Sequence, residues 1–222
     1  MFMVTSSTPA EGKSTFSLLF VVSAAVAHNK TLLVDCDLRR GLSSRVLGLS
    51  RKVGLADYLG GKAQLSDVIY HNKALGFSVI PRGKAVKNPT DLLSADKMQE
   101  MIARLRREFD YIVLDTPPIL PVVDTSILAK CVDRVLFVIR WKKTSRRCAI
   151  EAMKGRLSSA QNITSLILND VDQRRLQSYG YGYGAGYNYG HYYRSIGKYC
   201  EGTSDIGSKR KGWLLPRAFS RV

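Results

Sequence analysis

The sequence predicts a doubly wound α/β domain built around a mostly parallel β-sheet. Short apolar runs alternate along the chain with longer helical patterns, and the runs are apolar throughout rather than alternating with polar residues. Strands of that kind are typical of a parallel sheet covered by helices on both faces. A chain of 222 residues with 45% hydrophobic content is long enough for one such domain and a tail.

The expected elements follow the order of a doubly wound sheet. Strands are predicted over residues 2–4, 31–34, 77–80, 111–114, 135–139 and 166–168. Helices are predicted over residues 14–28, 96–107, 124–131 and 145–161. Because helices separate most of the strands, neighbouring strands are expected to run parallel.

Composition changes abruptly after Asp172. Eight of the eleven tyrosines lie between residues 179 and 199, where they are interleaved with glycine. Glycine disfavours ordered helix and strand interiors, and this segment has almost no aliphatic residues with which to build a core. We therefore expect a folded domain over residues 1–172 and a flexible, disordered tail over residues 173–222.

Net charge and cysteine content indicate which partners and which cellular compartment to expect. The formal net charge is +16, which favours anionic partners such as a nucleotide or an acidic membrane face. The last fourteen residues carry five basic side chains and no acid; a solvated tail and a membrane or nucleic-acid contact both remain open for them. Four cysteines without a C-x-x-C pair indicate neither a zinc site nor a disulfide framework, and favour a reducing, cytoplasmic compartment.

Neither a membrane span nor a signal peptide is expected. The longest apolar stretch, residues 16–27, is about half the ~20 residues that span a bilayer. Glu11 and Lys13 interrupt the N-terminal region before any apolar run begins.

A phosphate-binding loop is predicted between the first strand and the first helix. Residues 7–14 read Ser-Thr-Pro-Ala-Glu-Gly-Lys-Ser, close to the G-x-x-x-x-G-K-[ST] pattern with Ser7 in place of the first glycine. Lys13 is expected to reach the β- and γ-phosphates and Ser14 to ligate Mg²⁺, while a turn without a ligand is the alternative. The residues expected to bind the nucleotide here are Ser7, Pro9, Glu11, Gly12, Lys13, Ser14 and Thr15.

Two further motifs place carboxylates at strand ends. Asp35 and Asp37 follow a buried strand two residues apart, so that both can face one site. Asp115 ends another buried strand, in the arrangement of a Walker B acid that holds Mg²⁺ or a water bound to it. An isolated aspartate of this kind is more often a strand-end cap, but three beside a phosphate loop predict a site at the carboxyl edge of the sheet.

Three segments resemble motifs of the bacterial tyrosine kinases. Walker A corresponds to Ser6–Thr15, Walker A′ to Leu33–Arg39 and Walker B to Val113–Pro118. Residues 88–94, 109–111 and 138–144 resemble further family motifs, and the tyrosine cluster is the most distinctive feature. The resemblance implies a P-loop fold similar to the partition and septum-site ATPases. It also implies an ATP- and Mg²⁺-dependent kinase that phosphorylates its own tyrosines and regulates capsule or exopolysaccharide synthesis and export.

The resemblance also assigns roles to residues. Lys13, Asp35, Asp37 and Asp115 would be catalytic, and Ser14, Asp37 and Asp115 would hold the metal. Either Asp35 or Asp37 would receive the tyrosine proton, and Asn169 would hydrogen-bond adenine, although a lone Asn is more often a turn residue. The expected phosphate acceptors are Tyr179, Tyr181, Tyr183, Tyr187, Tyr189, Tyr192, Tyr193 and Tyr199.

Partners and location follow from the same resemblance. We expect a transmembrane activator or polysaccharide co-polymerase, a tyrosine phosphatase, no nucleic acid, and a cytoplasmic position at the inner face of the membrane. Family members carry a helix for ring assembly before the phosphate loop, which this sequence lacks. The chain is therefore expected to be truncated or to have a misplaced start, and to form a homo-oligomeric ring only with that segment present.

Two other functions compete with the kinase. One is a partition- or septum-type switch ATPase, but such proteins usually carry a lysine where this chain has Thr8. The other is a catalytically weak remnant whose Tyr/Gly-rich tail only binds partners. Arg39 and Arg40 are expected either to contact phosphate or to pair with nearby acids.

Overall fold

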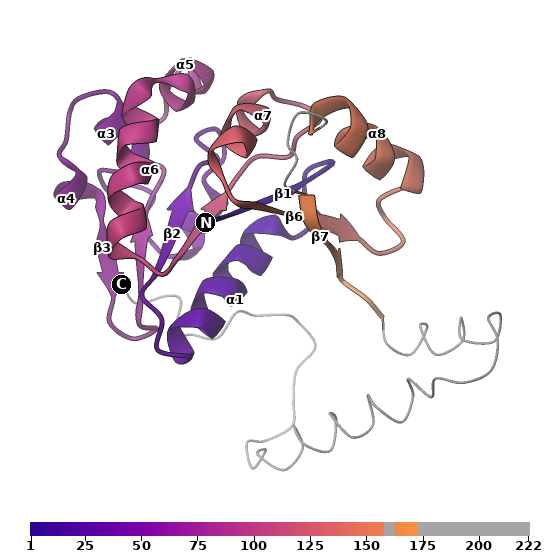
Figure 1. Cartoon of the computed structure of the whole chain (residues 1–222), viewed down its shortest axis with the longest axis horizontal. Helices are drawn as coiled ribbons and strands as arrows, with labels where there is room; N and C mark the ends of the chain where they lie inside the picture. Colours follow the sequence, from indigo (N-terminus) through magenta and orange to yellow (C-terminus); the bar gives the residue numbers. More distant parts are fainter. Residues whose placement is uncertain (158–162, 173–222) are drawn as a thin grey trace, which may run out of the picture. The chain divides into compact units, whose positions relative to one another are not determined.

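The computed structural model describes residues 1–157 and 163–172 (Figure 1). Met1–Asp170 lies within one compact unit, and Val171 begins another, of which only Val171 and Asp172 are described. The predicted tail and its tyrosine cluster lie outside the described residues.

Seven strands form one sheet in the described part of the chain. They are β1 (Phe2–Ser6), β2 (Thr31–Asp35), β3 (Tyr70–Asn72), β4 (Phe77–Ile80), β5 (Tyr111–Asp115), β6 (Arg134–Arg140) and β7 (Ile163–Asn169). Their order across the sheet is β3-β4-β2-β5-β1-β6-β7. Every pairing is parallel except that of β3 with β4, so the predicted mostly parallel sheet is confirmed.

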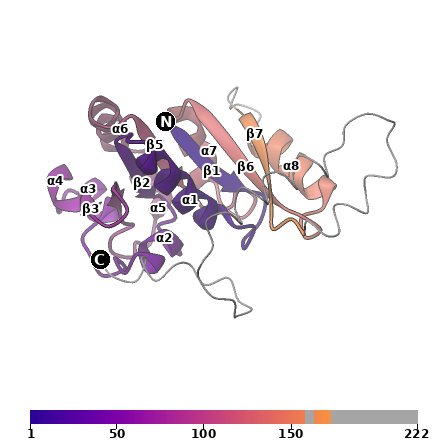
Figure 2. The same ribbon diagram turned by 90° about the horizontal axis from the view of Figure 1, so that it is seen from below.

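Helices connect the strands. They are α1 (Lys13–Val26), α2 (Leu42–Val46), α3 (Leu55–Leu59), α4 (Leu65–Val68), α5 (Pro89–Ser94), α6 (Asp96–Glu108), α7 (Asp124–Leu128) followed by the 3₁₀ turn η1 (Ala129–Cys131), and α8 (Arg146–Arg156). Figure 2 shows α1 against one face of the sheet and α6 on the opposite side. Among the described residues, no helix is long and apolar enough to cross a membrane.

Alternating strand positions divide the buried side chains between the two faces. Leu32 and Val34 of β2 belong to the main core cluster, together with Met98 and Met101 of α6. Leu33 lies between them and is fully buried outside that cluster, which places it on the face that α1 covers. Burial on both faces explains why the strands read as continuous apolar runs.

Most predicted elements are confirmed, with shifts at their ends. The helix predicted over residues 124–131 changes from α to 3₁₀ geometry after Leu128. The first helix ends at Val26 because His28 has a left-handed backbone, with φ of 62°. The last predicted helix extends only to Arg156 within the described residues. Five short elements, α2 to α5 and β3, were missed because three to six residues are too few to show a period.

The topology brings the predicted motifs to one edge of the sheet. Strands β1, β2 and β5 are neighbours, and Asp35 lies directly opposite Asp115 in the parallel register. The phosphate loop leaves the carboxyl end of β1 beside them. This edge is where ligands bind in open parallel sheets.

Candidate active site

The phosphate loop turns sharply between β1 and α1. Gly12 has a φ of +94°, which an L-residue with a side chain rarely adopts. A Cβ atom at Gly12 would also lie 1.9 Å from Asn169 Nδ2. Lys13 and Ser14 then open α1, whose first free N–H groups favour a phosphate. The backbone of the motif therefore favours glycine here, and a side chain at this position would have to displace the Asn169 amide.

Residues at or just after the ends of β6 and β7 hold this loop in place. Asn169 Nδ2 donates to the Glu11 carbonyl at 2.9 Å, and an Arg140 guanidinium N–H donates to the Ala10 carbonyl at 3.1 Å. The Glu11 carboxylate accepts from the Thr8 N–H at 3.1 Å and from the Thr144 hydroxyl. Glu11 is 2% exposed, so its side chain stabilises the loop from inside the fold.

Lys13 is a buried cation surrounded by acids. The residue is 8% exposed, and burial lowers the pKa of Lys13 from its ordinary value. Asp115, Asp37 and Glu11 oppose that effect by favouring the charged form. Opposite charges in a site of low dielectric interact more strongly than on the surface, so Lys13 is suited to bind a phosphate oxygen.

Asp115 presents one unpaired oxygen to the site. The side chain is fully buried, and its Oδ2 accepts a hydrogen bond of 2.6 Å from the Ser43 hydroxyl. Its Oδ1 has no hydrogen-bond partner among the described residues, although the Ser14 hydroxyl lies close enough to favour the carboxylate form. Burial raises the pKa of Asp115, because a desolvated carboxylate resists ionisation.

The buried oxygen at Asp115 fits a divalent cation. A buried charge without a partner is costly, and a cation beside Oδ1 would remove that cost. No cluster of three acidic, histidine or cysteine side chains able to hold a metal occurs in the described residues. Mg²⁺ commonly uses only one or two carboxylates together with substrate phosphates, so Asp115, Asp37 and the Ser14 hydroxyl suit it.

Asp35 and Asp37 differ in access. Asp35 is fully buried, and both of its oxygens accept hydrogen bonds, from the Asp37 N–H at 3.2 Å and from the Ser44 N–H and hydroxyl at 2.8 and 2.5 Å. Burial, followed by the charge of Asp115, raises the pKa of Asp35 to about 7. Asp37 keeps 8% exposure, and its Oδ1 accepts from the Arg40 N–H at 2.9 Å.

The two arginines after Asp37 take different roles. Arg39 pairs with the buried Asp124 at 3.1 Å, and Asp124 also accepts a 2.6 Å hydrogen bond from the Thr90 hydroxyl. Arg39 therefore ties the Walker A′ loop to α5 and α7. The Arg40 side chain is exposed, and its charge contributes to the lowered pKa of Lys13, which places it near the phosphate loop.

Sequence reasoning missed the side chains that support these residues. Ser43, Ser44, Asp124 and Thr144 each hold a predicted site residue or the loop that carries it. The sequence contained one signal for these supporting residues, namely the two hydroxyl side chains of Ser43 and Ser44 shortly after the Walker A′ acids. The predicted tyrosine acceptors lie outside the described residues, and Asn169 lies against the phosphate loop, where it bonds to backbone.

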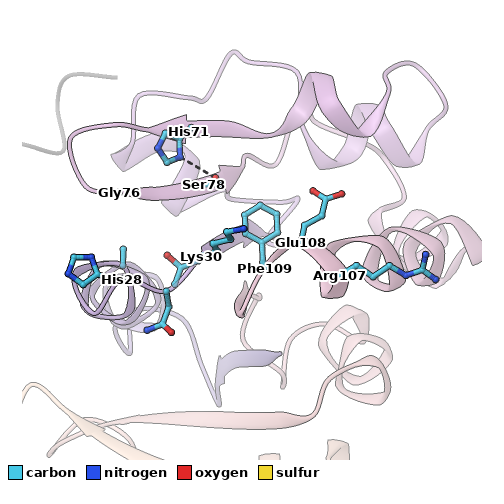
Figure 3. Close-up of a pocket in the computed structure, with 11 residues that line it drawn as sticks. His28, Lys30, His71, Gly76, Ser78, Arg107, Glu108 and Phe109 are labelled. Atoms are coloured by element: carbon cyan, nitrogen blue, oxygen red, sulfur yellow. Dashed lines mark hydrogen bonds between the residues drawn. The ribbon is translucent and has the colours of Figure 1, made fainter.

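One pocket in the described part of the chain lies at the opposite end of the sheet. It has a volume of about 800 Å³ and is lined by residues at the start of β2 and β4 and just before β5, including Lys30, Ser78 and Phe109. Figure 3 shows Phe109 between Lys30 and Glu108, with Arg107 pointing away. Lys30 and Asp35 are separated by the length of β2, on the order of 16 Å at ~3.3 Å per residue, so this pocket is separate from the phosphate loop.

Comparison with known proteins places the chain in a family. Residues 9–167 match the family described as AAA domain. The chain is 37% identical over 171 residues to the tyrosine-protein kinase CpsD of Streptococcus agalactiae, covering 77% of this chain and 74% of that protein. It is 35% identical over 181 residues to the tyrosine-protein kinase etk of Escherichia coli K12, covering 82% of this chain and 25% of the relative. It thus spans about a quarter of the length of etk.

Solved structures agree with this similarity. The kinase domain of Escherichia coli tyrosine kinase ETK matches with a TM-score of 0.75 and 35% identity, over 84% of this chain and 71% of that one. The septum site-determining protein MinD of Pyrococcus horikoshii, in complex with Mg-ADP, matches at a TM-score of 0.64 and 23% identity, over 80% and 75%. The second match concerns the fold alone. The Walker motifs meet at one edge of the sheet, and the matched relatives are named tyrosine-protein kinases. The chain therefore belongs to the bacterial tyrosine-protein kinase family.

Proposed function

We propose that this protein is an ATP-dependent protein-tyrosine autokinase that phosphorylates its own C-terminal tyrosines. The observation that carries the proposal is the convergence of Lys13, Asp37 and Asp115 beside a phosphate loop, with an unpaired carboxylate oxygen on Asp115. Relatives named as tyrosine-protein kinases support the same activity. The cluster of tyrosines between residues 179 and 199 supplies acceptors on the same chain.

The proposed step is a direct phosphoryl transfer. The tyrosine Oη forms a bond to the γ-phosphorus as the bond to the β,γ-bridging oxygen breaks, and ADP leaves. Lys13 neutralises charge on the phosphates, and the first N–H groups of α1 orient them. Mg²⁺ at Asp115 and Ser14 would supply further charge neutralisation. Most of the catalysis is therefore positioning and electrostatics.

Of the two Walker A′ acids, we assign the tyrosine proton to Asp37. Both oxygens of Asp35 accept hydrogen bonds inside the protein, and the side chain has no exposure. Asp37 keeps access to solvent. A base must come within about 3 Å of the proton that it removes, and only an accessible carboxylate can do so.

The wider role follows from the same proposal. Each phosphate adds about −1.5 to −2 charge to the tail at neutral pH, so several would repel one another and offset the basic excess. Such a change could dissociate a ring assembled through tail docking. We propose that it regulates capsule or exopolysaccharide synthesis and export, with a transmembrane co-polymerase as activator and a tyrosine phosphatase as antagonist, at the inner face of the cell membrane.

The test is phosphate mapping by mass spectrometry after incubation with Mg-ATP, with and without an activator fragment. The proposal expects tail phosphotyrosine that disappears in Lys13→Met and Asp115→Asn but persists in the matched control Lys30→Met, at the other end of β2. Phosphate release without phosphotyrosine would instead indicate a switch ATPase. No turnover even with the activator would indicate a remnant that binds partners.

A further inference from the structure

Helix α2 places two adjacent serines against two different carboxylates. Gly41, with φ of +55°, turns the chain after the Walker A′ acids, and its N–H donates to the Asp37 carbonyl at 2.7 Å. The helix that follows presents Ser43 and Ser44, both fully buried. Each hydroxyl has a carboxylate partner, but the partners lie on different strands.

Ser43 holds the carboxylate at the end of β5. Its hydroxyl donates to Asp115 Oδ2 at 2.6 Å, across 72 positions of sequence. The other oxygen of Asp115 has no hydrogen-bond partner in the described part of the chain. A donor fixed on one oxygen limits rotation of the carboxylate, so the second oxygen keeps a constant direction. Donors of this kind commonly orient the carboxylates that ligate metals.

Ser44 has a different set of partners. Its hydroxyl donates to Asp35 Oδ2 at 2.5 Å and accepts from the Arg82 N–H at 2.8 Å. Its own N–H donates to the same Asp35 oxygen. These bonds join β2, α2 and the segment after β4, and because the Asp37 N–H donates to Oδ1, neither oxygen of Asp35 is free. Ser44 therefore contributes to the fold around the site through Asp35 and Arg82.

We propose that Ser43 is a positioning residue for the magnesium site of the proposed kinase, acting by holding Asp115 so that its free oxygen faces the cation. The proposal rests on the assignment of this edge as the nucleotide and Mg²⁺ site. It predicts that loss of the Ser43 hydroxyl weakens the response to Mg²⁺ while nucleotide binding without metal is retained. Outer-shell partners of metal ligands are typically worth about 10- to 100-fold in metal affinity.

The experiment measures binding of a fluorescent ADP analogue to the full chain as Mg²⁺ is varied, and again in EDTA. In Ser43→Ala, the Mg²⁺ concentration for half-maximal enhancement of binding is expected to rise about tenfold or more, with the EDTA affinity within about twofold of wild type. Ser43→Thr keeps the hydroxyl and is expected to restore the wild-type curve. Ser43→Cys, a weak donor of similar size, is expected to behave like the alanine variant.

Ser44→Ala is the matched control on the same helix. It is expected to lower the melting temperature but to leave the Mg²⁺ midpoint within about twofold, because Asp115 keeps its donor. The proposal is overturned if Ser43→Ala and Ser43→Cys both give the wild-type Mg²⁺ curve, or if Ser44→Ala shifts it equally. The proposed kinase activity can fail independently of this inference. If wild type forms no phosphotyrosine but Ser43→Ala still shifts the Mg²⁺ curve, the kinase proposal is refuted and the positioning role of Ser43 is kept.

Discussion

The two ends of the parallel sheet carry different kinds of polar residue. At the carboxyl end, Asp35 and Asp115 are fully buried and Lys13 nearly so, within a network of short hydrogen bonds. At the amino end, Lys30, His71 and Glu108 line an open pocket and are exposed. The charged groups of the amino-end pocket are therefore solvated, whereas those at the carboxyl end are confined within the protein.

The difference indicates which end performs chemistry. Exposed charges are screened by water and cost the fold little. Buried charges destabilise a fold unless each is paired, and clusters of such groups with shifted pKa values mark functional sites. Asp115 retains an oxygen without a hydrogen-bond partner in such a cluster, among the described residues. We expect variants at the two ends to differ accordingly.

The largest effect is expected from Gly12→Ala, which would place a Cβ atom against Asn169 and force a left-handed backbone on alanine. We expect at least a tenfold loss of nucleotide affinity by fluorescence titration. Gly48→Ala is the control, because Gly48 also has a positive φ but a Cβ atom there would meet nothing within 4 Å. It should lower the free energy of unfolding by about 1–2 kcal/mol and leave nucleotide affinity unchanged. Equal losses of affinity in both variants would contradict this account.

A smaller effect is expected from Asn169→Ala, which removes the hydrogen bond from Nδ2 to the Glu11 carbonyl. If Asn169 acts by holding the loop, affinities for ATP and GTP should fall together by a few-fold, matching a bond worth about 1 kcal/mol. If Asn169 also contacts adenine, as the sequence suggested, the preference for ATP over GTP should be lost. Competition titrations with the two nucleotides separate these outcomes.

At the amino end, Asp133 should influence stability but not nucleotide binding. Its hydrogen bonds to Arg106, at 2.8 and 2.9 Å, lower the pKa of Asp133 from 3.8 to about 2. A lowered pKa means that the contribution is complete above pH ~4 and disappears as the pH falls toward 2. Because Asp133 is half exposed, Asp133→Asn should cost less than about 1 kcal/mol at pH 7.

Urea unfolding at several pH values checks this prediction. The difference in unfolding free energy between wild type and Asp133→Asn should shrink below pH 4. A difference that stays constant down to pH 2 would mean that the Arg106 contact does not set the acid response.

The smallest effect is expected within the amino-end pocket. The double variant His71→Ala with Glu108→Gln removes two exposed side chains from its lining. We expect nucleotide affinity within twofold of wild type and a change in unfolding free energy of no more than about 0.5 kcal/mol. A tenfold loss of nucleotide affinity would show that the two ends of the sheet are coupled, and would contradict the assignment of nucleotide binding to the carboxyl end alone.

The sequence by itself determined the fold class and the longer elements, and it predicted the candidate site residues. Apolar runs buried on both faces leave a strong pattern, as β2 and β5 show, and the Walker motifs have fixed spacings within single segments. Lys13, Asp35 and Asp115 could therefore be named as site residues before their surroundings were known. Short elements such as α2 and β3 leave no comparable pattern, because they span less than two helical turns or only one alternation.

Only the tertiary structure decided which groups support the site and what each acid can reach. The bond from Ser43 to Asp115 spans 72 positions, that from Arg39 to Asp124 spans 85, and that from Asn169 to Glu11 spans 158. Such contacts depend on strand order and on the register that sets Asp35 opposite Asp115. Burial distinguished Asp35 from Asp37 in the same way, since two acids so close in sequence differ in what the rest of the fold packs against them.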